Sequence, residues 1–90
     1  MAWKLELSAH AERDLDKLDS HPRKRILSFL FGRLANLDDP RGIGQALRGQ
    51  QFENLWRYRV GDYRLICEIQ DDRLLILVVK IGHRRDVYRF

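Results

Sequence analysis

The stretch LWRYRVGDYRLICEIQDDRLLILVVKIGHRRDVY, which runs from Leu55 to Tyr88, decides the fold. Successive side chains of a β-strand point to opposite faces, and polar and apolar residues alternate in this way over residues 55–60. Gly61-Asp62 follows as a two-residue signal for a tight turn between strands. These residues therefore predict a β-hairpin, and a two-residue loop places Arg59 directly opposite Arg64.

The predicted register gives this hairpin two unlike faces. Arg57, Arg59 and Arg64 share one face. The other face carries the mainly apolar residues Trp56, Tyr58, Tyr63, Leu65 and Cys67. Like charges directly across a strand pair destabilise a hairpin by up to roughly 1 kcal/mol, and an anion bound between the guanidinium groups offsets that repulsion. The alternative is a solvated face whose arginines pair with Glu68 or Asp62, and the hairpin pattern leaves both interpretations open.

A third strand is predicted after a turn at residues 70–73. Leu74–Val79, LLILVV, is apolar on both faces, which is typical of a central strand, and it is too short for a membrane span of ~20 residues. Gly82 can end this strand. Five polar or aromatic residues then crowd together: His83, Arg84, Arg85, Tyr88 and Arg89. If the third strand pairs with the second, these groups lie beside the arginines of the hairpin.

The first third of the chain predicts a strand followed by a helix. Trp3–Leu7 alternates as a strand, and Ser8 is a good N-cap for a helix over residues 9–20. The apolar stripe of that helix consists of Ala11, Leu15 and Leu18. Its charged positions are predicted to form a solvated face: Glu12, Arg13, Asp14, Asp16 and Lys17.

A second helix is predicted over Arg23–Asn36, with Ser20 or His21 as its N-cap and Pro22 in its first turn. Its apolar positions form a wide stripe for packing on the sheet, with Phe29 at the margin: Ile26, Leu27, Leu30, Phe31, Leu34 and Leu37. Residues 37–44 are predicted to form a loop, because one proline and two glycines interrupt regular structure there. Residues 45–49 are expected to be a half-turn that leads the chain back to the sheet.

The predicted order is β-α-α-β-β-β, which indicates a single α+β domain over residues 1–90. We expect the two-helix hairpin to cover one face of a mostly antiparallel sheet. The first strand reaches the sheet through a helical crossover, so it is expected to pair parallel to the last strand. The opposite face of the sheet would then hold the arginines.

Composition narrows the class of function. The chain is 44% hydrophobic and 33% charged, with a net charge of +4 and a pI near 9.6. A basic balance favours polyanionic partners, meaning nucleic acid or an acidic protein. Cys67 is the single cysteine, so an internal disulfide is excluded, and its side chain is predicted to lie in the core. A lone cysteine and the lack of a secretion signal in residues 1–10 indicate a cytoplasmic protein. The three histidines lie far apart in sequence, so no metal site is expected.

The order of elements and three phrases, ALRG, LWRYRVGDYRLICEI and LLILVVKIGHRRDVY, resemble the RelE family, within the RelE/ParE superfamily of bacterial toxins. The resemblance runs from Trp3 to Tyr88. Its most specific parts are the motifs Gly61-x-Tyr63-Arg64 and Gly82-x-Arg84-x-x-x-Tyr88. Each motif alone is weak, and their occurrence in this order is what identifies the family.

The resemblance implies a toxin that binds in the ribosomal A site and cuts mRNA, the 2′-hydroxyl attacking the adjacent phosphate without a cofactor. Arg64 matches the arginine that holds this phosphate, and Arg84 matches one that stabilises charge at the leaving oxygen. Tyr88 matches a tyrosine that activates the 2′-hydroxyl or stacks on a base. Arg57 stands where related toxins have a phosphate-binding lysine, and Arg59 and Arg85 are further candidates for substrate binding.

One position departs from the family pattern. Leu55 replaces a second basic residue, and fewer positive charges near Tyr88 leave the pKa of a tyrosine closer to ~10, which weakens it as a base. His83 could compensate, because imidazole is a natural proton carrier near neutral pH. The alternative is that His83 is a turn residue without a role in proton transfer.

The resemblance also implies partners and leaves two other functions open. An acidic antitoxin is expected to bind the toxin in a hetero-oligomer, and ribosome and mRNA are the expected targets. A ParE-like toxin shares the fold and inhibits DNA gyrase without cutting RNA, but such toxins generally lack the combination of Arg84 and Tyr88. A third possibility is a basic RNA-binding module without activity.

Overall fold

The computed structural model describes residues 2–49 and 54–85. Its elements follow one another as β1 (Lys4–Leu7), α1 (Ala9–Asp16), α2 (Ser20–Gly32), the 3₁₀ turns η1 (Leu34–Asn36) and η2 (Pro40–Ile43), β2 (Gln45–Ala46), β3 (Leu55–Val60), β4 (Tyr63–Gln70), η4 (Asp71–Arg73) and β5 (Leu75–His83).

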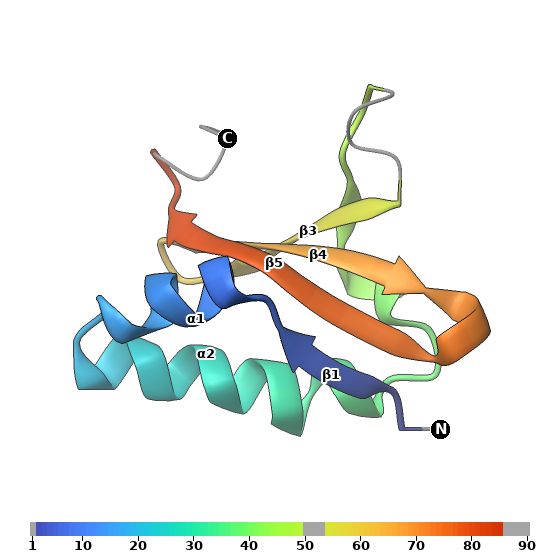
Figure 1. Ribbon diagram of the computed structural model, residues 1–90, viewed down its shortest axis with the longest axis horizontal. Coiled ribbons are helices and arrows are strands. Elements are labelled where there is room, and N and C mark those ends of the chain that lie inside the picture. Colours follow the sequence, from blue (N-terminus) through green and yellow to red (C-terminus); the bar gives the residue numbers. More distant parts are fainter. Residues whose placement is uncertain (1, 50–53, 86–90) are drawn as a thin grey trace.

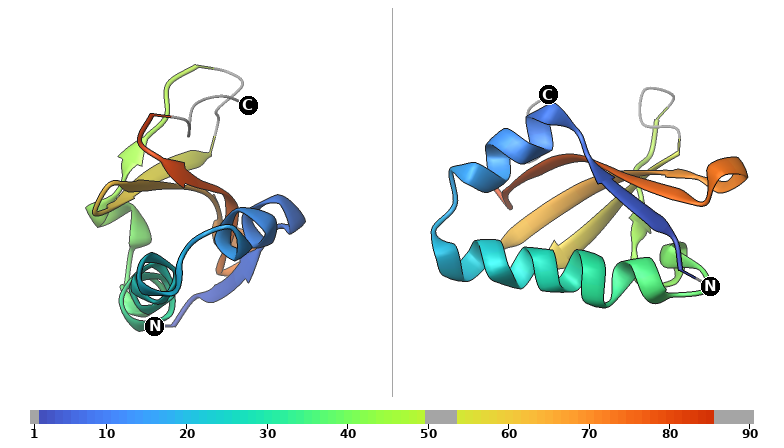
Figure 2. Two further views of the ribbon diagram at one scale, coloured as in Figure 1. Left: turned by 90° about the vertical axis from the view of Figure 1, so that its left-hand side faces the viewer. Right: turned by 60° about the horizontal axis from the view of Figure 1, so that its bottom comes forward.

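The strands form one sheet in the order β1-β5-β4-β3-β2, and α1 and α2 lie together on one of its faces (Figures 1 and 2). β1 pairs parallel to β5, and the other pairs are antiparallel. The predicted α+β class, the helix-covered face and the parallel pairing of the first and last strands are therefore confirmed. The predicted half-turn at residues 45–49 is wrong in part, because Gln45 and Ala46 form a fifth, edge strand.

The predicted hairpin register is confirmed. Val60 pairs with Tyr63 and Arg59 pairs with Arg64 across a turn made by Gly61-Asp62. Gly61 has a φ of 58°, a conformation that residues with a Cβ rarely adopt. A Cβ there would also lie 2.8 Å from Nη1 of Arg25 on α2. The turn thus requires glycine for its backbone conformation, whereas the flexible end of the Arg25 side chain could move to admit a Cβ.

The core lies between the helices and the inner face of the sheet. Its buried members come from both layers: Trp3, Ala11, Leu15, Ile26, Leu30, Leu34, Tyr58, Val60, Leu65, Cys67, Ile69, Ile76, Val78 and Ile81. Cys67 is fully buried as predicted, and burial raises the pKa of its thiol. The predicted stripe of α2 is wrong for Phe31, which is 52% exposed. The residue that follows Leu30 is turned by about 100° around a helix, and this carries Phe31 off the buried face.

Two polar side chains fasten α1 to the sheet. Ser8 caps the helix as predicted, accepting a hydrogen bond at Oγ from the N–H of Ala11 (3.0 Å) and donating one to the carbonyl of Val79 (2.9 Å). Asp14 was predicted on a solvated face, but its Oδ2 accepts a hydrogen bond from the N–H of Ile81 (3.0 Å). The prediction failed because sequence periodicity cannot show where strand pairing stops. The pairing of β1 with β5 ends at Val78, so β1 does not reach the N–H of Ile81.

α2 begins earlier and ends earlier than predicted. Asp19 is its N-cap, in place of Ser20 or His21, and the α-helix ends at Gly32 before the 3₁₀ turn η1. Beyond it, η2 packs against the sheet through the buried hydroxyl of Tyr58, which donates a 2.8 Å hydrogen bond to the carbonyl of Pro40. Burial raises the pKa of this phenol, so it remains a donor at neutral pH.

The contact between Tyr58 and Gly44 can be tested by adding one methyl group. A Cβ at Gly44 would lie 2.7 Å from Cε1 of the buried Tyr58 ring. We predict that Gly44→Ala lowers the free energy of unfolding by ~1–3 kcal/mol, because a packed ring must shift. Gly42→Ala is the matched control, since nothing lies within 4 Å of its Cβ position. Equal urea midpoints for the two variants would contradict this packing.

Candidate nucleic-acid interface

Four basic residues share the outer face of the sheet, opposite the helices, and we call them the basic face: Arg57, Arg59, Arg64 and Lys80. Arg59 pairs with Arg64 across β3 and β4, and Ile66 pairs with both Arg57 and Lys80. Ile66 is fully buried although it points away from the helices, which indicates that side chains of the basic face lie over it.

Lys80 was not among the residues predicted for the site, and a β-bulge explains why. Ile76 and Val78 face the core, so strict alternation along β5 would point Lys80 inward as well. The register shifts between Ile66 and Cys67, and Val79 is left without a partner on β4. The extra residue turns Lys80 to the outer face and Ile81 to the core, as bulges commonly do. Lys80 followed by Ile81, after a run that is apolar on both faces, carried no clear signal of this shift.

Arg64 and Arg84 come together at the turn between β3 and β4. Nη1 of Arg64 donates hydrogen bonds to the carbonyls of Gly61 and Tyr63, both at 3.1 Å. The backbone N–H of Arg84 donates to the carbonyl of Asp62 at 2.9 Å. This hydrogen bond ties the residue after β5 to the hairpin turn, and Arg84 and Arg85 are exposed beside it.

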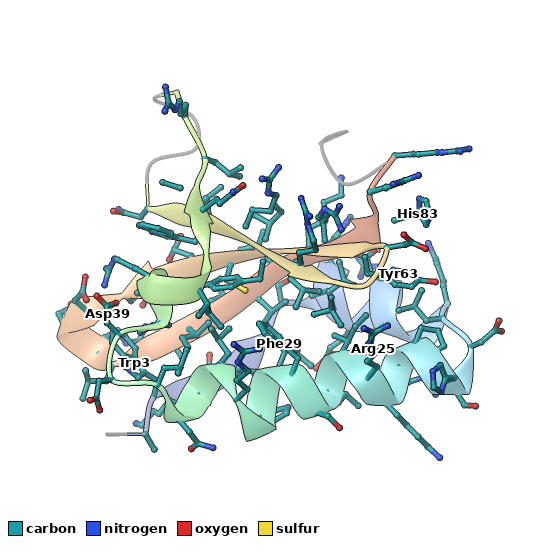
Figure 3. All side chains as sticks on the ribbon, turned by 180° about the vertical axis from the view of Figure 1, so that it is seen from behind. Trp3, Arg25, Phe29, Asp39, Tyr63 and His83 are labelled. Carbon is teal, nitrogen blue, oxygen red and sulfur yellow. The ribbon has the colours of Figure 1, made fainter. Side chains whose placement is uncertain are left out.

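His83 lies on the other side of β5 from the basic face. In the register His83 pairs with Tyr63, whereas Gly82 pairs with Arg64. The rings of His83 and Tyr63 meet edge to face with centroids 6.0 Å apart, and Figure 3 shows them side by side. Nδ1 of His83 accepts a 3.4 Å hydrogen bond from the N–H of Arg85. The strand register therefore separates His83, the last residue of β5, from Arg64, and the role of His83 in proton transfer stays a prediction.

Tyr88, the predicted catalytic tyrosine, lies outside the described residues, so its role also stays a prediction. The structure thus brings together five of the seven predicted site residues on or beside one end of the sheet: Arg57, Arg59, Arg64, Arg84 and Arg85. Figure 1 shows the end of β5 and the segment after β2 rising beyond the sheet on the side away from the helices. These two segments flank the basic face.

The opposite end of the sheet is acidic. A pocket of about 530 Å³ there is lined by Asn54, Glu68, Ile69, Gln70, Asp71 and Asp72. Arg41 binds Asp71 with two hydrogen bonds, one of 3.0 Å, and lies 5.8 Å from the centre of the Trp56 ring. The hydrogen bond from Arg41 lowers the pKa of Asp71 and raises that of Arg41. Opposite charge at the two ends gives an anionic strand a preferred end of the sheet.

A smaller pocket of about 230 Å³ opens at the β2 edge of the basic face, lined by Ile43, Gln45, Arg57 and Arg59. Within the described ranges, no three His, Cys, Asp or Glu side chains are grouped to hold a metal ion. No helix in those same ranges has the length and apolar character needed to cross a membrane.

The family described as the ParE toxin of type II toxin–antitoxin systems matches residues 5–88. The chain belongs to this family. It is 30% identical over 89 residues to the toxin RelG of Mycobacterium tuberculosis, covering 99% of each chain. It is 32% identical over 87 residues to the toxin RelE of the same organism, covering 97% of this chain and 87% of that one.

A solved structure gives the same result. The toxin–antitoxin complex RelBE2 of Mycobacterium tuberculosis contains a chain that superposes with a TM-score of 0.84 at 28% identity, covering 96% of this chain and 95% of that one. The predicted membership of the RelE group within the RelE/ParE superfamily is therefore confirmed. The protein is a toxin of a type II toxin–antitoxin system.

Lys80, the member of the basic face on β5, provides a test of RNA binding by this face. We predict that Lys80→Gln weakens binding of short single-stranded RNA and lowers the slope of log K against log salt by ~0.7, the value for one phosphate contact on a single strand. Lys4→Gln, which removes an exposed lysine from the outer face of β1, should leave the slope unchanged. Fluorescence anisotropy over a salt series measures both. Equal slopes for the two variants would remove Lys80 from the interface.

Proposed function

We propose that this toxin is an endoribonuclease that cuts mRNA in the ribosomal A site. The observation that carries the proposal is the meeting of Arg64 and Arg84 at the turn between β3 and β4, next to a face on which arginines stand directly opposite each other. Two nearly full-length relatives are named RelE and RelG toxins, which supports the same class.

The proposed reaction is an attack of the 2′-hydroxyl oxygen on the adjacent phosphorus. The bond from phosphorus to the 5′-oxygen breaks, which leaves a cyclic phosphate and a free 5′-hydroxyl. Such a transfer needs in-line positioning, neutralisation of charge and two proton movements, and it needs little covalent help from the protein. In this proposal Arg64 holds the non-bridging oxygens, and Arg84 neutralises charge at the leaving oxygen, which takes its proton from water, without a metal ion.

Tyr88 is proposed to take the proton from the 2′-hydroxyl or to stack on a neighbouring base. Arg57, Arg59 and Arg85 are proposed to hold flanking phosphates, since planar guanidinium groups match phosphate oxygens in pairs. Arg59 stands directly across from Arg64. Phosphates bound beside each of them, the one to be cut at Arg64 and a flanking one at Arg59, would relieve the repulsion of this pair, so the placement is favourable once RNA is bound.

The proposed partner is an acidic antitoxin. The net charge of +4 suits such a protein, because complementary charge speeds association and excludes wrong partners. The RelBE2 structure is, by its name, a toxin–antitoxin complex, and its toxin-like chain has this fold. The ribosome enters the proposal only through the resemblance to RelE toxins.

A second candidate is inhibition of DNA gyrase by binding, which the resemblance to ParE-like toxins implies; the matched family is described as ParE toxin. The fold serves both candidates equally. The arrangement of Arg64 and Arg84 at one turn favours the ribonuclease, because a gyrase-binding toxin has no need to gather cations around a single phosphate.

The proposal predicts cleavage of mRNA that depends on ribosomes. Purified toxin should cut an mRNA on programmed ribosomes and leave the same naked mRNA intact, as mapped by primer extension. Arg64→Ala should reduce the cleavage rate by about 10²–10³-fold, the usual effect of removing one charge-stabilising donor. Arg13→Ala, on the exposed side of α1, is the control and should cut at the wild-type rate.

Each other outcome rejects part of the proposal. Cuts in naked mRNA would remove the ribosome from the mechanism. No cuts in either sample, from a toxin that still binds its antitoxin, would favour gyrase inhibition, which a DNA supercoiling assay measures directly. Unchanged cleavage by Arg64→Ala would mean that the basic face only binds RNA.

A further inference from the structure

The pocket at the β2 edge of the basic face has a mixed chemistry that phosphate binding alone does not require. It is lined by two arginines, Arg57 and Arg59, one glutamine, Gln45, and one apolar residue, Ile43. The pocket exists because β2 pairs with β3, which sets Gln45 directly across from Arg57. Gln45 therefore lies on the outer face of the sheet, one strand beyond Arg57.

This pocket is separate from the position of the phosphate proposed to be cut. Arg64 lies on β4, while Gln45 lies on β2, two strands away in the sheet. Neighbouring strands are ~4.8 Å apart, so about 10 Å separates the two backbones. When Arg64 holds one phosphate, a neighbouring nucleotide of the same RNA chain could occupy the pocket. Arg59, which pairs with Arg64, lies between the two positions.

We infer that this pocket binds a nucleotide flanking the cut, with adenine as its preferred base, and that Gln45 is the residue that reads it. The inference rests on the proposed ribonuclease function. Arg57 and Arg59 would hold the phosphate of this nucleotide. The amide of Gln45 offers one donor and one acceptor group, which match the N6 and N7 edge of adenine. Single-stranded RNA exposes such base edges.

Ile43 completes the fit to a nucleotide. Its side chain is 39% exposed, which is high for isoleucine, and it lines the pocket beside the two arginines. An apolar wall suits the flat face of a base.

The test is the base preference of cleavage on ribosomes. Wild-type toxin is given a library of mRNAs with every codon in the A site, and the cut ends are sequenced. We expect a bias toward adenine at one fixed position next to the cut. Gln45→Leu should reduce this bias by about tenfold, within the range for one paired amide contact, while cleavage of the best non-adenine codons stays near the wild-type rate. Gln45→Glu keeps the size of the side chain but removes its donor, and should reduce the bias similarly.

Gln70→Leu is the matched control, because Gln70 is also a glutamine on the outer face but lies at the acidic end of β4. It should leave the bias unchanged. Cleavage without an adenine bias, or a bias that survives both changes at Gln45, overturns the inference and leaves the ribonuclease intact. No cleavage by wild-type toxin overturns both. Weaker antitoxin binding by the Gln45 variants, with an unchanged bias, assigns the pocket to the antitoxin and also overturns the inference.

Discussion

The two-residue turn at Gly61-Asp62 is the constraint on which the other features depend. Because side chains alternate along a strand, a shift of one residue in the pairing of β3 with β4 would exchange the two faces of the hairpin. The turn fixes a single register, in which Tyr58 and Leu65 enter the core while Arg59 and Arg64 meet on the outside. The same register stabilises the fold on one face and concentrates positive charge on the other.

The turn also anchors the candidate site through its backbone. The three carbonyls from Gly61 to Tyr63 accept hydrogen bonds from the side chain of Arg64 and from the N–H of Arg84. Arg25 of α2 packs against Gly61 from the other side. The two arginines proposed to act on one phosphate are thus positioned by one turn, next to which lies the side chain of a helix residue.

Much of this arrangement could be predicted from local patterns. Alternation and the Gly61-Asp62 signal gave the hairpin and its register, and the cap at Ser8 gave the start of α1. Lys80 could not be placed, because a bulge opposite Ile66 and Cys67 reverses the alternation of β5. The edge strand at Gln45 could not be predicted either, because a two-residue strand has too few positions to show a period. Both misses come from pairing between distant segments, which no local pattern reports.

The central claim is that the basic face suits a bound anion at a cost in stability. Its most direct test is to measure the free energy of unfolding of Arg59→Thr and of the wild type, with and without single-stranded RNA. Without RNA at low salt, we predict that the variant is more stable than the wild type by up to ~1 kcal/mol, since the repulsion between Arg59 and Arg64 is gone. With RNA, the wild type should gain more stability than the variant, because a ligand that binds only the folded state stabilises it by RT ln(1 + [L]/Kd), which is larger for the tighter complex. A variant that is less stable without RNA would contradict the account, because it would mean that Arg59 is held by acidic groups of the protein itself.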